Sequence, residues 1–375
     1  MLNIKKITSS IFAIGLVTIG LSPIAHADKS LSFSVEAVTP KTQVNKKVSY
    51  FDIKTEPGSE QDIEVKLKNI NNREVVVNLG INSAKTNTNG VVEYAKTDIK
   101  NDKTLKYDLS KLVTGPETIK LPAKSEKKVK LHVKGPKDNF DGVIAGGLNF
   151  SEKETKDKTK ETEDKEQQSI ALENKFAFNL AIVMHPGKDT EKPDLKLNDV
   201  FADTLNYRNV ISLNLQNPGA AYLSNLKTDI EIFKKGSKEP QYTTHKQDMQ
   251  MAPNTNFNLP VNLEETKLIP GTYVAKVVAH GQKSPEGKYI SGEDEQGKVI
   301  RYDHKWEFEK EFKIKFMEAS RLNSQNIVKE KDNTLWYILL IALLLIILLL
   351  VGLYLMKRNK DMKRKLAEAE SKNEA

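Results

Sequence analysis

Apolar and polar residues alternate in short runs that recur through most of the chain. A period of two is typical of strands that bury one face, because successive side chains point to opposite sides of a sheet. Turn-forming pairs such as Pro57-Gly58 and Asn89-Gly90 separate many of the runs. The runs lie at residues 31–35, 62–68, 75–79, 128–133, 170–185, 195–200, 210–215, 226–233, 257–261, 271–278 and 306–312. This pattern predicts an all-β fold with two tandem immunoglobulin-like β-sandwich domains, at residues 28–187 and 193–316.

An uninterrupted apolar run without a charged side chain occupies residues 335–355. The run is long enough to cross a bilayer as one helix, and basic residues follow it from Lys357 to Lys365. A buried core helix, the alternative, would need other apolar helices around it and would not need a basic cluster. The positive-inside rule therefore predicts a single C-terminal transmembrane helix, with residues 356–375 as a basic cytoplasmic tail and the N-terminal part outside.

The first residues have the layout of a secretory signal. Lys5 and Lys6 precede an apolar stretch at residues 11–21, and a small-residue triplet ends at Ala27. We therefore predict a signal peptide at residues 1–27. The polar, proline-free residues 317–334 are predicted to be a spacer above the membrane. The expected location is the cell membrane, in a single pass, with the ectodomain at the cell wall or surface.

The formal net charge of +8 comes largely from the two ends of the chain. Without the signal and the tail the ectodomain is close to neutral, which gives no reason to expect nucleic-acid binding. The chain has no cysteine, so an exported domain must be stabilised by core packing alone. This composition favours a Gram-positive cell surface.

Residues 151–168 form a charged tract with no apolar residue that could face a core. The mixed signs favour a solvated loop or a long hairpin tip inside the first domain over a charged interaction tail. The acidic run at residues 293–295 lacks the alternating spacing of a calcium loop and favours a second hairpin tip. No HExxH, GxSxG, P-loop or dinucleotide motif occurs in the sequence. We therefore expect a non-enzyme without cofactor or metal.

Five blocks of the sequence resemble the WxL-interacting protein family of Gram-positive surfaces. Residues 50–69, 84–94 and 140–150 are similar to the family's peptidoglycan-binding domain, and residues 213–236 and 251–277 are similar to its host-binding domain. The resemblance implies that the first domain binds peptidoglycan and the second binds an extracellular host ligand. It also implies cooperation with WxL-domain surface proteins on the wall.

Aromatic, amide and carboxylate side chains in the first three blocks are candidates for glycan binding, because such groups match sugar faces, hydroxyls and N-acetyl groups. The candidates are Tyr50, Asp52, Asn87, Asn89, Tyr94 and Asp141. A structural role is the competing interpretation for each residue. Tyr50 and Phe51 must face opposite sides of a strand, Asn89-Gly90 is an ordinary hairpin turn, and Gly146 permits close backbone approach.

Three function classes stay open at this point. The leading hypothesis is a membrane-anchored scaffold that binds peptidoglycan and a WxL-domain or host protein. The second is an adhesin for a host extracellular matrix protein. The third is a chaperone-like assembly factor that adds a strand to exported chains, which the Lys-rich candidate edge strands disfavour.

Overall fold

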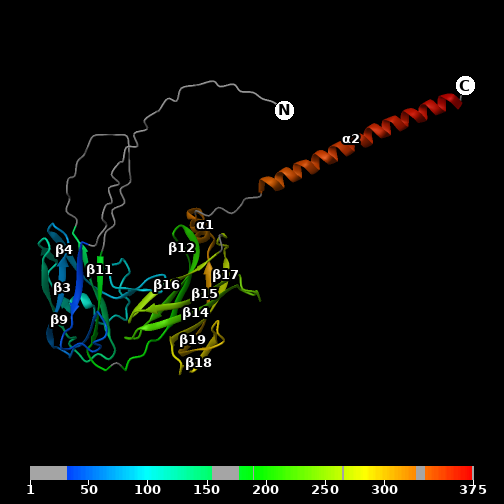
Figure 1. Cartoon of the computed structure of the whole chain (residues 1–375). Coiled ribbons are helices and arrows are strands. Elements are labelled where there is room, and N and C mark those ends of the chain that lie inside the picture. Colours follow the sequence, from blue (N-terminus) through cyan, green and yellow to red (C-terminus); the bar gives the residue numbers. More distant parts are fainter. Residues whose placement is uncertain (1–31, 154–176, 189, 264–265, 327–333, 374–375) are drawn as a thin grey trace, which may run out of the picture.

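The computed structural model describes residues 32–153, 177–188, 190–263, 266–326 and 334–373. Two β-sandwiches stand side by side and are followed by two helices (Figure 1). The predicted all-β fold with two sandwiches and one C-terminal apolar helix is confirmed. The signal prediction at residues 1–27 lies outside the described residues, and so does the charged tract beyond residue 153.

The first sandwich consists of two facing sheets. One sheet has the strand order β1 (Phe33–Val38), β3 (Glu60–Asn69), β9 (Glu126–Lys134) and β7 (Val113–Thr114). The other has the order β2 (Phe51–Lys54), β11 (Ala177–His185), β10 (Ile144–Glu152), β4 (Val75–Ser83) and β8 (Thr118–Leu121). The β11–β2 pair is parallel. A hairpin of β5 (Lys85–Thr86) and β6 (Val92–Glu93) and a 3-10 helix (Leu109–Lys111) complete this half.

Strand β3 shows why the alternating pattern forms a sheet. Ile63, Val65 and Leu67 are at most 1% exposed and belong to the core of the first sandwich. The polar residues between them face water and pair with lysines of the neighbouring strand, as Glu64 does with Lys128 at 3.7 Å. Burial of the apolar face supplies the stabilisation, because exposed ion pairs contribute little.

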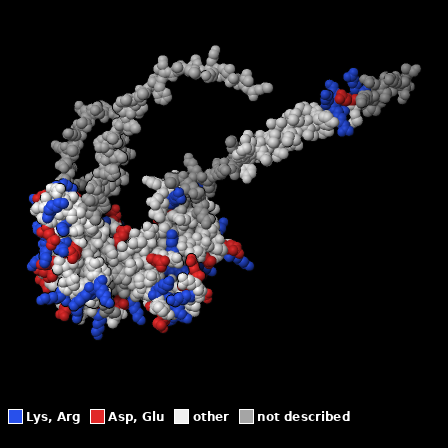
Figure 2. Space-filling view, in the orientation of Figure 1, with Lys and Arg blue, Asp and Glu red and all other residues white. Residues whose placement is uncertain are grey.

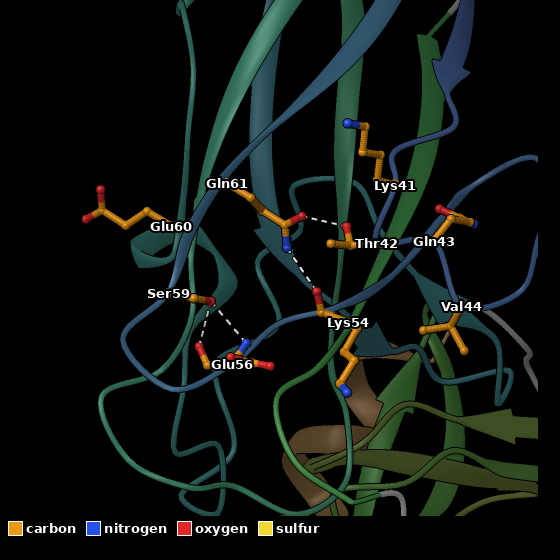
Figure 3. Close-up of a pocket in the computed structure, with 9 residues that line it drawn as sticks. All are labelled: Lys41, Thr42, Gln43, Val44, Lys54, Glu56, Ser59, Glu60 and Gln61. Carbon is orange, nitrogen blue, oxygen red and sulfur yellow. Dashed lines mark hydrogen bonds between the residues drawn. The ribbon is translucent and has the colours of Figure 1, made fainter.

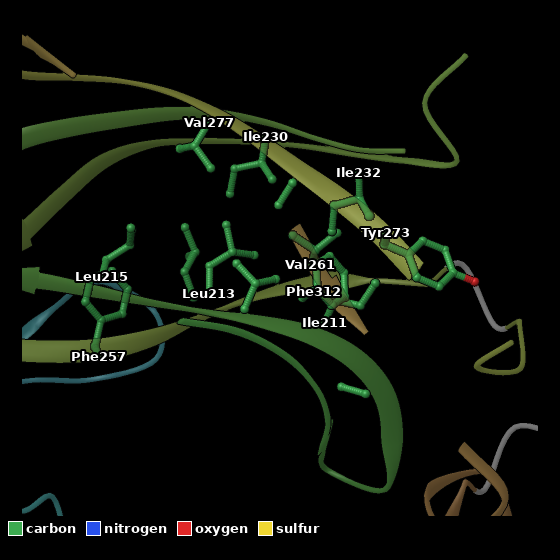
Figure 4. Close-up of a cluster of buried hydrophobic side chains, with 14 of the residues drawn as sticks. Ile211, Leu213, Leu215, Ile230, Ile232, Phe257, Val261, Tyr273, Val277 and Phe312 are labelled. Atoms are coloured by element: carbon green, nitrogen blue, oxygen red, sulfur yellow. The ribbon is translucent and has the colours of Figure 1, made fainter. Parts of the chain in front are cut away.

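The second sandwich also has two sheets. The smaller one has the order β12 (Lys196–Leu205), β13 (Arg208–Asn217) and β16 (Thr255–Asn262). The larger one has the order β15 (Tyr242–Met251), β14 (Leu223–Lys234), β17 (Gly271–Lys283), β19 (Val299–Ile314) and β18 (Tyr289–Glu293). Leu213 and Leu215 of β13 lie opposite Ile230 of β14 and Val277 of β17 in the core between the sheets (Figure 4).

Helix α1 (Phe316–Gln325) packs against the second sandwich. Ala319 and Leu322 are 2% and 3% exposed and join its core. The side chain of Asn323 accepts hydrogen bonds from the Leu268 backbone amide at 2.9 Å and from Asn209 at 2.8 Å. The first part of the expected spacer at residues 317–334 is therefore a docked helix and a part of the second sandwich.

Helix α2 (Thr334–Asn373) contains a stretch from Trp336 to Arg364 that is long and apolar enough to cross a membrane. Figure 2 shows its uncharged surface followed by a band of charged side chains. The helix continues through this band, so the segment expected as a tail, residues 356–375, is helical up to Asn373. Continuation is expected because residues 361–371 are rich in Lys, Glu and Ala, which are strong helix formers.

The β5–β6 hairpin reaches from the first sandwich to the second (Figure 1, cyan). The hydroxyl oxygens of Thr86 and Thr255 lie 2.7 Å apart, and Thr86 also accepts a hydrogen bond from the Ala252 amide at 3.0 Å. At the tip, the Gln250 amide donates to the Gly90 carbonyl at 2.7 Å. These contacts join the hairpin of the first sandwich to strands β15 and β16 of the second and the turn between them.

Candidate ligand-binding site

Three of the six predicted site residues lie together where the two sandwiches meet. We call Tyr50, Asp52, Tyr94, His185 and Tyr222 the junction cluster. The Tyr94 and Tyr222 hydroxyl oxygens are 3.2 Å apart, one from each sandwich. Asp52, on β2, is 9% exposed. Its Oδ1 lies 2.5 Å from Nε2 of the His185 ring, within hydrogen-bond distance. The parallel β2–β11 pairing brings Asp52 and His185 to neighbouring positions although they are distant in sequence.

The local environment raises the pKa of two tyrosines of the junction cluster, Tyr50 and Tyr222. Burial raises the pKa of Tyr50, and the charges of Asp52 and Tyr94 add to this effect. Burial also raises the pKa of Tyr222 well above its usual value, with further contributions from Tyr94, Tyr50 and Asp52. Their hydroxyls therefore stay protonated and can donate hydrogen bonds. Tyr50 and Tyr94 are only half-buried, so they combine an accessible ring with a polar group.

Asn87 and Asn89 lie apart from this cluster, in the turn of the β5–β6 hairpin. The Asn87 side-chain oxygen accepts hydrogen bonds from the amides of Asn89 and Val91 at 2.9 and 3.1 Å. Its side-chain nitrogen donates to Glu93 at 2.7 Å. Asn87 therefore fixes the turn, and Gly90 adopts the left-handed conformation with φ +70° that the turn requires. The structural interpretation of Asn89-Gly90 as a hairpin turn agrees with this geometry.

Asp141 lies at the connection between the sandwiches. Its side chain accepts a hydrogen bond from the Lys188 amide at 3.2 Å. The next residue, Gly142, has φ +91°, and an added Cβ would lie 2.4 Å from the Ala220 carbonyl oxygen. Asp141 is exposed, and its hydrogen bond with Lys188 fixes the chain that connects the sandwiches. It does not join the junction cluster.

A shallow pocket of about 510 Å³ opens beside β2 and β3 (Figure 3). Its polar groups largely pair with one another. Gln61 accepts from Thr42 at 2.5 Å and donates to the Lys54 carbonyl at 3.0 Å, while Ser59 and Glu56 bond across their turn. None of the described residues that line this pocket is aromatic. It is therefore less suited to stacking on a sugar than the junction cluster.

Sequence patterns did not identify the partners that complete the junction. His185 and Tyr222 are not among the six candidate site residues. Asp102 carried no motif, yet it is 7% exposed and accepts hydrogen bonds from Gln216 and Asn256 of the second sandwich. The signal that would reveal them is spatial, because each pair joins segments more than a hundred residues apart in the chain.

Among the described residues, no three or more His, Asp or Glu side chains form a cluster that could hold a metal ion. Asp294 lies instead in the tight turn between β18 and β19. Its side chain accepts hydrogen bonds from the amides of Gln296 and Lys298 at 3.0 and 2.9 Å. This carboxylate therefore has a structural role in the turn.

Solved structures with some likeness to the chain include three chaperones. They are the class 5 fimbriae chaperone CfaA (13% identity, 72% of this chain and 99% of that chain covered, TM-score 0.28), the YadV chaperone (15%, 76% and 100%, TM-score 0.28) and the E. coli chaperone DraB (13%, 76% and 97%, TM-score 0.24). Their low TM-scores support no functional argument. No curated protein matches the chain.

Two family models match the chain in order. The WxL Interacting Protein peptidoglycan binding domain matches residues 33–152, and the WxL Interacting Protein host binding domain matches residues 167–324. The second match begins before β11, a strand that pairs within the first sandwich. Both models describe binding domains, and together they span both sandwiches and most of α1. The chain therefore belongs to the WxL-interacting protein family.

Proposed function

We propose that this protein is a membrane-anchored surface scaffold whose first sandwich binds peptidoglycan and whose second binds a partner protein. The observation that best supports this proposal is the order of the family matches, in which a peptidoglycan-binding domain is followed by a host-binding domain. These matches make the chain a cell-surface peptidoglycan-binding protein. The apolar stretch of α2 after both domains supports membrane anchoring. No catalytic role is part of this proposal.

Within the first sandwich, we assign the wall contact to Tyr50, Asp52 and Tyr94. The two half-buried rings offer stacking faces, and their hydroxyls can donate to glycan oxygens. Asn87 and Asp141 already hold the hairpin turn and the connecting chain, so we assign them structural roles. Asn89 is an exposed residue of the same turn. Only Tyr50 and Tyr94 therefore combine proximity with accessible binding groups, and the buried Asp52 lies beside them.

Sedimentation of the ectodomain, residues 28–326, with washed cell-wall sacculi tests this assignment. The Tyr50→Ala and Tyr94→Ala double variant should leave most of the protein in the supernatant. Tyr289→Ala is the matched control, because Tyr289 is also half-buried but lies on β18 of the second sandwich. Equal sedimentation of the double variant and the wild type would reject the junction cluster as the wall site. Failure of the wild type to sediment would reject wall binding itself.

The second sandwich is proposed to bind a WxL-domain protein of the same cell, with a host matrix protein as the other partner class. Parallel pull-downs with the whole ectodomain from bacterial surface extract and from host matrix separate these classes. Capture of only the bacterial protein supports the scaffold, and capture of only a matrix protein supports the adhesin. Recovery of neither would contradict a binding role for this sandwich.

Orientation is proposed from the basic residues that follow the apolar stretch of α2. Protease added to wall-stripped cells should degrade both sandwiches and spare a small fragment that contains residues 336–375. A fully protected ectodomain would reverse the proposed orientation.

A further inference from the structure

A second hollow in the first sandwich lies apart from the junction cluster. It has a volume of about 240 Å³ and is formed by the end of β4, the start of the β5–β6 hairpin and the loop that leads to the 3-10 helix. We call it the Lys85 pocket. Its lining includes Ile81, Asn82, Lys85, Ala95, Ile99 and Asp108.

Lys85 is a buried cation in this pocket. The residue is only 8% exposed, and its ammonium donates a hydrogen bond to the side-chain oxygen of Asn101. Within the described part of the chain, no carboxylate lies at ion-pair distance from it. A buried charge without a counterion is costly, so this arrangement leaves the ammonium in need of an anion.

Nearby carboxylates do not supply this anion. Asp108 accepts hydrogen bonds from Ser83, Ser110 and Asn101, and Asp102 accepts from Thr104 and from the second sandwich. Burial lowers the pKa of Lys85, and the charges of Asp108 and Asp102 oppose this effect without forming an ion pair. The ammonium therefore keeps donor capacity for a group that enters the pocket.

Asn82 also lines this pocket and carries an unsatisfied donor. Its side-chain nitrogen is buried and has no hydrogen-bond partner among the described residues. An unsatisfied buried donor costs as much as its lost hydration, and such groups are rare in folded proteins. A ligand oxygen that reaches both Asn82 and Lys85 would remove this cost. Ile81, Ala95 and Ile99 add apolar surface beside the two donors.

We propose that the Lys85 pocket binds the free α-carboxylate of a peptide that ends in a small apolar residue such as alanine. The carboxylate would accept hydrogen bonds from Lys85 and Asn82, and a terminal methyl group would contact the apolar wall. The volume suits one terminal residue rather than a sugar chain. This inference rests on the proposed wall-binding function, because the peptide ends of peptidoglycan carry such carboxylates. Binding of a protein C-terminus is the competing outcome.

Calorimetric titration of the ectodomain tests the proposal with four probes: acetyl-lysyl-D-alanyl-D-alanine, the same peptide with an amidated C-terminus, its L-alanyl-L-alanine counterpart, and an N-acetylglucosamine oligomer. The free carboxylate should bind at least about tenfold more tightly than the amide, because hydrogen bonds to charged groups are the strong ones. Binding of the amide at equal affinity, or of the sugar alone, would overturn the proposal. Tighter binding of an L-alanyl-L-alanine peptide would favour a protein C-terminus.

Lys85→Met is the informative variant, since it removes the charge and keeps an apolar stem. It should weaken binding of the free carboxylate by at least about tenfold, while the melting temperature stays constant or rises, because replacing a buried charge by an apolar group is often neutral or stabilising. Lys120→Met, at an exposed position of β8, is the matched control and should bind as the wild type does. Unchanged binding by Lys85→Met would reject the site.

Asn82→Ala is a second variant that tests the site even if Lys85→Met does not fold. It should weaken binding of the carboxylate without loss of folding, since the removed amide has no partner to lose. Sedimentation with sacculi separates the two proposals. A wild type that sediments but ignores all peptide probes rejects the Lys85 pocket and leaves wall binding intact, whereas peptide binding without sedimentation rejects wall binding.

Discussion

The carboxylate of Asp102 in the first sandwich accepts the side-chain amide of Gln216 in the second, at 2.8 and 2.9 Å to its two oxygens. Asn256 of the second sandwich donates to the same carboxylate. The backbone amide and the hydroxyl of Thr104, in the first sandwich, donate to it as well. Burial alone would raise the pKa of Asp102, but the hydrogen bonds from Thr104, Asn256 and Gln216 outweigh burial and lower it. The junction is therefore a polar contact that depends on an ionised, buried carboxylate.

Asp102→Ala is predicted to weaken the junction. The change leaves the buried amides of Gln216 and Asn256 without their acceptor, which costs about 1–3 kcal/mol per group. Calorimetry of the ectodomain should show a lower melting temperature and a separation of the two sandwiches into distinct transitions. Asp98→Ala, an exposed change in the same loop, should leave the transition unchanged. One unshifted transition for Asp102→Ala would show that this contact does not couple the sandwiches.

Strand periodicity predicted most of the fold, because burial follows the alternation that defines a strand. The run at residues 62–68 became β3, with Ile63 and Leu67 in the core. Strand β15 was missed, since only Met249 and Met251 are buried among its polar residues. Helix α1 was expected as a spacer because its apolar contact is confined to a few residues such as Leu322. An element with so few buried residues is recognised only when the strands that it packs against are known.

The candidate site was less predictable because its contacts join distant segments. Tyr94 meets Tyr222 across the two sandwiches, and Asp52 meets His185 through a parallel strand pair. Lys85 lies in a polar stretch of the sequence, where a lysine is expected to be exposed. The surrounding loop buries it, and the sequence pattern does not show this. Burial and pairing of this kind depend on tertiary packing, which residue type and spacing do not encode locally.

Gly142→Ala is predicted to destabilise the ectodomain more than Gly58→Ala. Both glycines have positive φ, so each change adds a backbone cost of about 1–2 kcal/mol. At Gly142 the new Cβ would also lie 2.4 Å from the Ala220 carbonyl oxygen, whereas no atom lies within 4 Å at Gly58. Urea unfolding of the two variants separates the steric cost from the backbone cost. Equal unfolding free energies would mean that the chain around Ala220 shifts freely.

His280→Phe is predicted to reduce the acid sensitivity of the second sandwich. His280 is 4% exposed, and neither ring nitrogen has a partner among the described residues. Burial, followed by Lys227 and Lys305, lowers its pKa from 6.5 against the opposing charges of Asp229 and Glu307.

The sign follows from proton uptake. The unfolded chain binds the proton near pH 6.5 and the folded chain resists it, so stability is lost as the pH falls below that value. Urea midpoints at pH 7.5 and 5.0 should therefore differ less for His280→Phe than for the wild type, and the variant keeps an aromatic ring against Tyr302. His245→Asn is the exposed control. An unchanged pH response would assign the acid sensitivity to another group.

Leu322→Ala tests whether α1 is a structural part of the second sandwich. Leu322 is 3% exposed in the core, so its truncation should cost about 3 kcal/mol through lost burial and the cavity left behind. Met317→Ala, on the same helix but 82% exposed, should change the unfolding free energy by less than about 0.5 kcal/mol. Both are measured by urea unfolding of residues 28–326. If both variants match the wild type, α1 does not contribute to the core, and the segment after Ile314 is the spacer that its polar sequence predicts.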